Sequence, residues 1–217
     1  GTGKTAAFSL PILELLDESN SNVQAIILSP TRELAVQIGN NIKDFCKYLP
    51  KIKVATVYGG SSMEDQIRAL KRGSQIVVGT PGRTVDLIKR RALKLGNVQW
   101  LVLDEADEML NMGFKDELDK VLEATPETKQ TLLFSATFPE QVKTLTLELL
   151  KNPIEIQLQS SESSTLVQRV FTVNKGQKTA LLAHLIKQQK WKQVLIFVNA
   201  KNSCNHLADK LSKRGIN

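Results

Sequence analysis

Short runs of apolar and β-branched residues recur along the first 150 residues and lack the polar alternation of a half-exposed strand. They span residues 25–28, 54–57, 76–78, 101–103 and 131–134. Strands that are buried on both faces have this pattern. Between the runs, apolar residues recur at helical spacing, as in the stripe from Leu34 to Leu49. Alternating strands and helices predict an α/β fold in which helices cover both faces of a parallel sheet.

The pattern breaks at the polar, serine-rich stretch "QLQSSESST", residues 157–165, which has no periodicity and is typical of a linker. The alternation then resumes, with strands expected near 167–173 and at 194–198 and helices near 178–189 and 203–214. About fifty residues are few for an independent α/β domain. We therefore expect a first domain at 1–156, a linker at 157–166 and the beginning of a truncated second domain at 167–217.

Polar or small residues follow each predicted strand of the first domain. In chain order the segments are "SPTRELA", "YGG", "GTPGR", "DEAD" and "SAT". The carboxyl ends of parallel strands meet at one edge of a sheet, where ligands of α/β proteins bind. One such segment is what an ordinary loop contains, but five together predict that ligands bind at this edge of the sheet.

The first five residues, Gly1, Thr2, Gly3, Lys4 and Thr5, match the end of the phosphate-binding pattern G-x-x-x-x-G-K-[ST]. Glycines let backbone N–H groups approach phosphate oxygens, and a helix N-terminus adds positive potential. We expect Lys4 to reach the β- and γ-phosphates of ATP and the Thr5 hydroxyl to bind Mg²⁺. A glycine-rich helix start with a solvated lysine is the alternative.

Three carboxylates follow the apolar run "WLVL": Asp104, Glu105 and Asp107. Acidic residues favour the first turn of any helix, which is the simplest interpretation. A P-loop NTPase, however, needs an acid at the end of a second parallel strand to hold Mg²⁺. We assign Asp104 to the metal, Glu105 to orienting or deprotonating the attacking water, and Asp107 to links with neighbouring motifs.

Net charge is +7 and the isoelectric point is near 9.4, which favours a polyanionic partner. Aromatic residues make up 5% of the chain, so contacts to phosphates are favoured over base stacking. The spacing of Cys46 and Cys204 favours buried, inert thiols, and the two histidines have no zinc-ligand spacing. No apolar run reaches membrane-helix length, so we expect a cytoplasmic protein without a membrane partner.

These motifs, in this order, resemble the DEAD-box ATP-dependent RNA helicases of helicase superfamily 2. The resemblance covers nearly the whole chain: "GTGKT" at 1–5, "PTRELA" at 30–35, "GG" at 59–60, "TPGR" at 80–83, "DEAD" at 104–107, "SAT" at 135–137 and "IFVN" at 196–199. It implies a P-loop NTPase domain of RecA-like fold, followed by the start of a second, truncated RecA-like domain.

The resemblance also implies roles. Catalysis falls to Glu105, Asp104 and Lys4, with ATP and Mg²⁺ held by the P-loop, Asp104 and Glu105. The RNA backbone is gripped by Pro30, Thr31, Arg32, Gly59, Gly60, Thr80, Pro81, Gly82 and Arg83. ATP state is coupled to RNA remodelling by Asp107, Ser135, Ala136 and Thr137. Locally, "PT" could be a plain helix cap, "GG" a plain turn and "SAT" a strand-ending turn.

Against the family pattern, the chain lacks the start of the phosphate loop, the adenine-recognition segment and the arginine fingers of the second domain. We therefore expect this polypeptide alone to hydrolyse ATP poorly, and the full-length protein to unwind RNA locally with little sequence preference. Two alternatives stay open: a DNA-directed superfamily 2 ATPase, and a non-catalytic RNA clamp switched by ATP.

Overall fold

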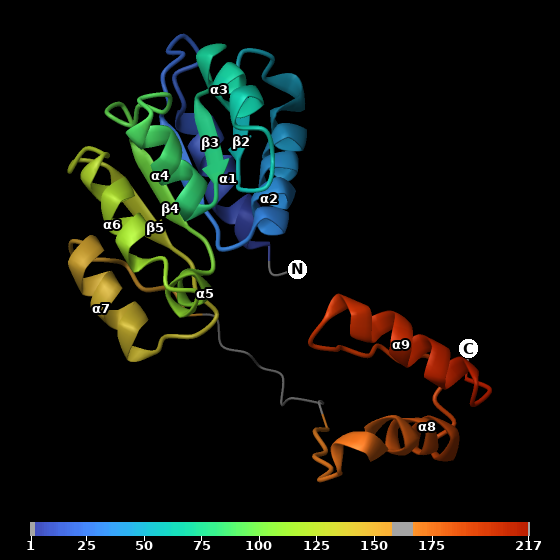
Figure 1. The fold of residues 1–217 in the computed structure, drawn as a ribbon. Helices are drawn as coiled ribbons and strands as arrows, with labels where there is room; N and C mark the ends of the chain where they lie inside the picture. The colour runs from blue at the N-terminus through green and yellow to red at the C-terminus, as the bar shows by residue number, and fades with distance from the viewer. Residues whose placement is uncertain (1–2, 158–166, 217) are drawn as a thin grey trace. The chain divides into compact units, whose positions relative to one another are not determined.

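The structure is a computed structural model that describes residues 3–157 and 167–216 (Figure 1). The chain divides into two compact units, residues 1–155 and 156–217, each described here by itself. The linker predicted at 157–166 lies almost wholly outside the described residues. Among the described helices, none combines the length and apolarity needed to cross a bilayer.

The first unit contains a five-stranded sheet in the order β2-β3-β1-β4-β5, in which every neighbouring pair is parallel. The strands are β1 (Ala25–Leu28), β2 (Val54–Val57), β3 (Ile76–Gly79), β4 (Trp100–Leu103) and β5 (Gln130–Leu133). All five strands predicted from the sequence are confirmed, with ends that differ by one residue in β3, β4 and β5.

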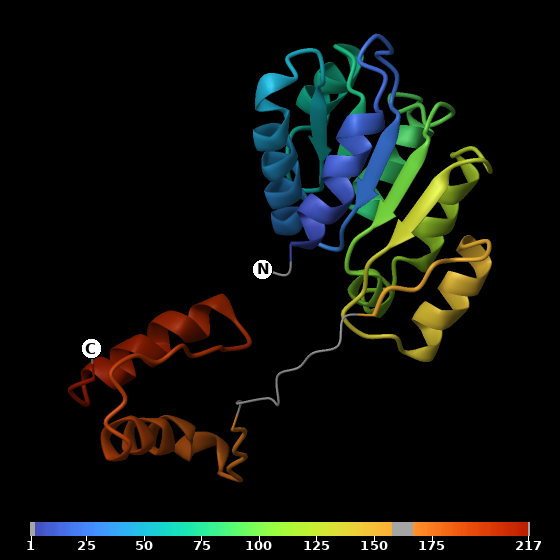
Figure 2. The ribbon, with the colours of Figure 1, turned by 180° about the vertical axis from the view of Figure 1, so that it is seen from behind.

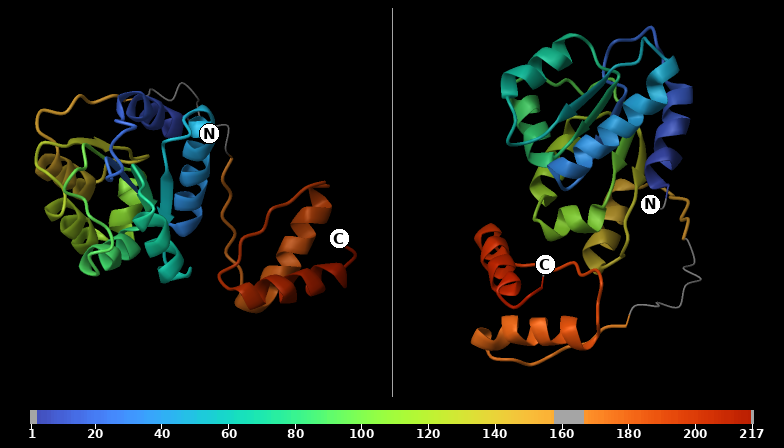
Figure 3. Two further views of the ribbon diagram at one scale, coloured as in Figure 1. Left: turned by 90° about the horizontal axis from the view of Figure 1, so that it is seen from above. Right: turned by 90° about the vertical axis from the view of Figure 1, so that its right-hand side faces the viewer.

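Helices cover both faces of this sheet, as Figure 1 and, from behind, Figure 2 show. They are α1 (Lys4–Leu15), α2 (Arg32–Phe45), α3 (Met63–Lys71), α4 (Pro81–Lys89), α5 (Ala106–Asn111), α6 (Lys115–Glu123) and α7 (Glu140–Leu149). A 3₁₀ turn, η1 (Cys46–Tyr48), extends α2. The two views in Figure 3, one from above and one from the side, show the same layers around the sheet.

Successive residues of each central strand point into two different cores. In β1, Ala25 and Ile27 pack with α1 and α2, whereas Ile26 and Leu28 join the core beneath α4, α5 and α6. All four residues are essentially inaccessible to solvent. This burial on both faces explains why the strands are continuous apolar runs. A parallel sheet with helices on both faces is a doubly wound sheet.

The last residues of the five strands lie in one row across the sheet. Leu28 pairs with both Gly79 and Leu103, Val57 pairs with Gly79, and Leu103 pairs with Leu133. Each sequence motif that follows a strand therefore starts at the same edge. The fold thus places the five motif loops side by side, as the strand pattern predicted.

The second unit contains η2 (Lys175–Gln177), α8 (Lys178–Gln188) and α9 (Lys201–Ser212). Both predicted helices are confirmed, although α9 begins two residues earlier than expected. The helices contact each other, and the Lys187 ammonium donates a 2.6 Å hydrogen bond to the Arg214 carbonyl.

Two predictions for this unit are wrong. Residues 167–173 and 194–198 form no strands, and apolar side chains within them, such as Val170 and Phe197, are almost fully exposed. A strand exists only where a neighbouring strand pairs with its backbone, and the described residues of this unit provide none. Cys204 was also expected to be buried, but it lies exposed on α9, while Cys46 is buried as predicted.

Candidate nucleotide and nucleic-acid site

The phosphate-loop motif ends where α1 begins. Gly3 precedes the helix with φ 71° and ψ 6°, a left-handed conformation that glycine adopts without steric cost. Lys4 is the first residue of the helix, and Thr5 is the second. Free N–H groups at such a helix start favour anionic ligands. Gly1 and Thr2 lie outside the described residues.

The structure brings Lys4 and Asp104 together across 100 positions of sequence. The Lys4 ammonium lies 3.8 Å from Asp104 Oδ1, too long for a hydrogen bond but close enough for an attractive charge interaction. The lysine side chain is 31% exposed and the aspartate side chain 5%. The pair therefore combines a solvent-accessible cation with a buried carboxylate at one edge of the sheet.

Asp104 is a buried carboxylate with an unsatisfied oxygen. Its Oδ1 atom accepts no hydrogen bond among the described residues. Burial raises the pKa of this carboxyl group, while Lys4 and the backbone N–H of Glu105 counteract that rise. A buried carboxylate oxygen without a donor is a suitable ligand for a hard divalent cation, so the residue fits the predicted magnesium.

Glu105 occupies an unusual backbone conformation, with φ 55° and ψ 53°, directly before α5. Non-glycine residues adopt this left-handed region at a cost of about 1–3 kcal/mol, and they cluster at functional sites. Hydrogen bonds of its two neighbours maintain this conformation. The Asp104 N–H donates to the Leu28 carbonyl at 2.9 Å, and the Ala106 N–H donates to the Phe134 carbonyl at 3.0 Å. The backbone of Glu105 is thus held between two residues that are hydrogen-bonded to neighbouring strands, directly after Asp104.

Asp107 turns toward the "SAT" segment. Its Oδ2 atom accepts hydrogen bonds from the Thr137 N–H at 3.0 Å and from the Thr137 hydroxyl at 2.7 Å. Ser135 donates in turn to the Thr137 carbonyl at 2.6 Å, and Ala136 lies between them. Burial alone would raise the pKa of Asp107, but hydrogen bonds from Thr137, Ser135 and the backbone hold it below its usual value.

The predicted RNA-contacting residues occupy the starts of two helices. Thr31 caps α2 by accepting a 3.3 Å hydrogen bond from the Leu34 N–H, so the plain cap function is present. Arg32 begins that helix after Pro30, and its guanidinium pairs with exposed Glu33 at 2.5 Å.

Thr80 precedes α4, whose first three residues are Pro81, Gly82 and Arg83. Arg32 and Arg83 therefore both lie in the first turn of a helix.

The "YGG" turn after β2 lies against both helix starts. A side chain on Gly60, which has φ 80°, would come within 3.3 Å of an Arg32 guanidinium nitrogen. Both Arg83 guanidinium NH₂ groups donate to the Ser61 carbonyl, at 3.2 and 3.3 Å. The Thr80 N–H donates to the Val57 carbonyl at 3.0 Å. Three segments from separate parts of the sequence thus form one continuous surface.

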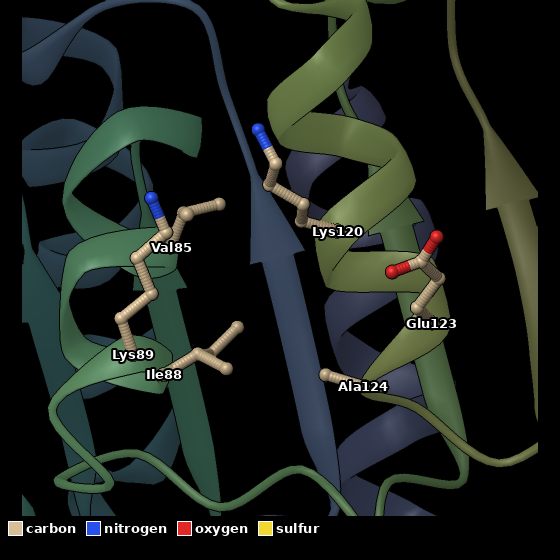
Figure 4. Close-up of a pocket in the computed structure, with 6 residues that line it drawn as sticks. All are labelled: Val85, Ile88, Lys89, Lys120, Glu123 and Ala124. Atoms are coloured by element: carbon tan, nitrogen blue, oxygen red, sulfur yellow. The ribbon is translucent and has the colours of Figure 1, made fainter.

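Two hollows in the first unit lie away from these residues. One, of about 300 Å³, separates α4 from α6 (Figure 4) and is lined by Val85, Ile88, Lys89, Lys120, Glu123 and Ala124. The other lies between α1 and the end of α2, and its lining includes Leu10 and Phe45. None of the predicted site residues that the structure describes lines either hollow.

Sequence reasoning missed two contributors to this edge. Gln66, in α3, donates a 3.0 Å hydrogen bond to the Tyr58 carbonyl, and Ser61 supplies the carbonyl that Arg83 binds. A signal for Gln66 existed: it occupies the inward face of α3 among apolar residues such as Met63 and Ile67. A backbone carbonyl such as that of Ser61 gives no sequence signal.

Comparison with protein families agrees with this geometry. The family model described as DEAD/DEAH box helicase matches residues 1–145. This match covers both the P-loop residues and the acidic motif. The chain belongs to the DEAD/DEAH box helicase family.

Members of this family align with the chain from end to end. It is 44% identical over 218 residues to RNA helicase CrhR of Synechocystis, covering 99% of the chain and 44% of that protein. It is 43% identical over 219 residues to ATP-dependent RNA helicase DeaD of Escherichia coli, covering all of the chain and 35% of that protein. The chain therefore spans less than half the length of these relatives.

The fold is also that of a solved family member. A DEAD box protein from the hyperthermophile Methanococcus jannaschii superposes with a TM-score of 0.68 at 40% identity, covering 99% of this chain and 58% of that one. The predicted RecA-like parallel sheet of this DEAD/DEAH box chain is thereby confirmed.

Proposed function

We propose that the protein to which this chain belongs is an ATP-dependent RNA helicase, in which RNA-stimulated ATP hydrolysis drives local unwinding of short duplexes. The observation that carries the proposal is the 3.8 Å approach of the Lys4 ammonium to Asp104 at the sheet edge where the motif loops start. A P-loop ATPase needs a lysine that contacts the phosphates and an acid that holds the metal, and Lys4 and Asp104 supply both at one edge of the sheet.

The chain would bind ATP phosphates at the start of α1. Backbone N–H groups of the helix start and the Lys4 ammonium supply positive charge, and Gly3 leaves room for a phosphate oxygen because it has no side chain. The 31% exposure of the Lys4 side chain leaves it accessible to a ligand.

Asp104 and Thr5 would hold Mg²⁺, partly through water. The unsatisfied, buried Oδ1 atom of Asp104 supports this assignment. When bound, the cation neutralises charge on the phosphates during transfer.

Glu105 would orient the attacking water or accept its proton. Support for this role comes from the left-handed backbone of Glu105 and from the backbone hydrogen bonds of its two neighbours, which hold the residue directly after the proposed metal ligand Asp104. A non-catalytic clamp would have no need of a strained acid at this point.

The RNA backbone would lie along Arg32, Thr31, Gly59, Gly60 and the start of α4. Helix starts, hydroxyls and glycines contact phosphates and sugars rather than bases, so we expect strong salt dependence and little sequence preference. The Asp107 pair with Thr137 would transmit the nucleotide state to the segment that leads into α7. A cytoplasmic location stays a prediction.

The test measures ATP hydrolysis by the full-length protein with single-stranded RNA, with DNA of the same sequence, and without nucleic acid. We expect RNA, but not DNA, to stimulate ATP turnover. The Lys4→Ala variant should not bind ATP. Lys43→Ala, an exposed lysine on α2, is the matched control and should hydrolyse ATP normally. Equal stimulation by DNA would favour a DNA-directed ATPase, and RNA that stays bound without turnover would favour a clamp.

A further inference from the structure

The turn that carries Gly59 and Gly60 is held at both ends by side chains from elsewhere. Both glycines are exposed, as is Ser61 after them. Gln66 Nε2 donates to the Tyr58 carbonyl at 3.0 Å before the glycines, and Arg83 donates twice to the Ser61 carbonyl after them. Glycine pairs are conformationally free, so a turn of this kind keeps one shape only if its flanks are fixed.

Gln66 is an unexpected residue for its position. It is the only buried residue of α3, at 6% exposure, although apolar side chains of the same helix pack against the core only partly buried. Its Oε1 atom is buried and accepts no hydrogen bond among the described residues. An apolar side chain of similar size would avoid this unsatisfied acceptor, so packing alone does not account for a glutamine here.

The two other buried glutamines of the first unit behave differently. Gln24 accepts from the Asp17 N–H and donates to the carbonyls of Asp17 and Asn20. Gln75 accepts from the Lys53 N–H at 2.9 Å and donates to the Lys51 carbonyl at 3.3 Å. Both carboxamides use donor and acceptor, as structural glutamines should. Both flank the beginnings of strands, at the opposite edge of the sheet from the motif loops.

We propose that Gln66 is a positioning residue for RNA binding: it holds the Tyr58 carbonyl and so fixes the Gly59 and Gly60 turn in the shape that receives the RNA backbone. The inference deepens the proposed function and rests on it. The Nε2 group of the carboxamide is hydrogen-bonded and its Oε1 atom is not. Gln66 therefore fixes the shape of the turn but lowers the local stability.

The experiment compares Gln66→Met with Gln75→Met in the full-length protein, using RNA-stimulated ATPase assays and thermal unfolding. For Gln66→Met we expect the RNA concentration at half-maximal stimulation to rise about threefold to tenfold, as loss of one hydrogen bond implies. We expect no change in turnover at saturating RNA or in the KM for ATP without RNA. The Tm should stay the same or rise. For Gln75→Met we expect a lower Tm and an unchanged RNA requirement.

A second variant isolates the donor. Gln66→Glu keeps the side-chain shape but replaces the N–H donor with an acceptor facing the Tyr58 carbonyl, so its RNA requirement should rise at least as much as that of Gln66→Met. An unchanged RNA requirement in either variant would overturn the inference. So would a Tm loss in Gln66→Met as large as that in Gln75→Met, since it would mark a structural role.

The outcomes separate this inference from the proposed function. If RNA fails to stimulate the unaltered protein, the proposed function is refuted and the inference falls with it. If RNA stimulates the unaltered protein and Gln66→Met alike, the inference alone is refuted.

Discussion

Thr137 gives two hydrogen bonds to a single carboxylate oxygen of Asp107, one from its backbone N–H at 3.0 Å and one from its hydroxyl at 2.7 Å. The two residues follow neighbouring strands, β4 and β5. An ionised carboxylate that is largely buried needs such donors, and hydrogen bonds to charged groups are stronger than neutral ones. The contact therefore joins the acidic loop to the segment that leads into α7.

Thr137→Val tests this link. The variant loses the hydroxyl donor but keeps the backbone one, so we expect about 1–2 kcal/mol less stability and weaker coupling between ATP hydrolysis and unwinding. ATP binding should be unaffected because the P-loop is not changed. Duplex separation per ATP hydrolysed measures the coupling. Thr144→Val, which removes an exposed hydroxyl on α7, is the control; equal losses in both variants would argue against a coupling role.

Glu105→Gln should abolish ATP turnover in the full-length protein while sparing ATP binding. The amide has nearly the same shape but cannot accept a proton, and the backbone hydrogen bonds that flank the residue are unaffected. Binding of a fluorescent ATP analogue and steady-state hydrolysis distinguish the two effects. Glu108→Gln, on the exposed side of α5, serves as the control. Normal turnover in Glu105→Gln would exclude Glu105 as the base.

Gly79→Ala should destabilise the first unit by about 1–3 kcal/mol, the usual cost of overpacking. An added methyl group would come within 2.6 Å of a Val57 methyl and 2.7 Å of the Thr84 hydroxyl. Gly79 ends β3 directly before Thr80, so the start of α4, where we propose that RNA binds, should shift as well. Chemical denaturation measures the change. For Gly96→Ala, where the methyl group meets no atom within 4 Å, the free energy of unfolding should not decrease.

The two cysteines should react at very different rates with a thiol reagent. Cys204 is exposed, whereas Cys46 is buried, and burial raises the pKa of its thiol. A raised pKa leaves less of the reactive thiolate at pH 8, so both access and ionisation slow Cys46. Labelling should show one fast thiol in the native protein and a second only after unfolding in guanidinium. Cys204→Ser should remove the fast phase, and Cys46→Ser should keep it.

Much of the first unit could be read from the sequence because its signals are local. Strands buried on both faces appear as uninterrupted apolar runs, and β1 to β5 follow those runs to within a residue. The P-loop glycines and the acids after β4 are short motifs that can be recognised in the sequence without knowledge of the fold. Parallel pairing then required Lys4 and Asp104 to meet at one edge, which the 3.8 Å distance confirms.

The predictions that failed were those that depend on partners distant in sequence. The β-prone runs at 167–173 and 194–198 have the right composition but no neighbouring strand among the described residues of their unit, so their backbones remain unpaired. Cys204 lies in a pattern that suits a buried helix face, yet the described residues of its unit leave that side of α9 uncovered.

In the first unit, the sequence by itself determined the order of the strands, the double burial of the sheet, and the identity of the charged groups at strand ends, because these depend on residue type and spacing. Only the tertiary structure decided which groups touch: that Thr137 donates to Asp107, that Arg83 donates to the Ser61 carbonyl and that the buried Gln66 donates to the Tyr58 carbonyl. Backbone carbonyls are identical along every chain, so only folding determines which of them a side chain can reach.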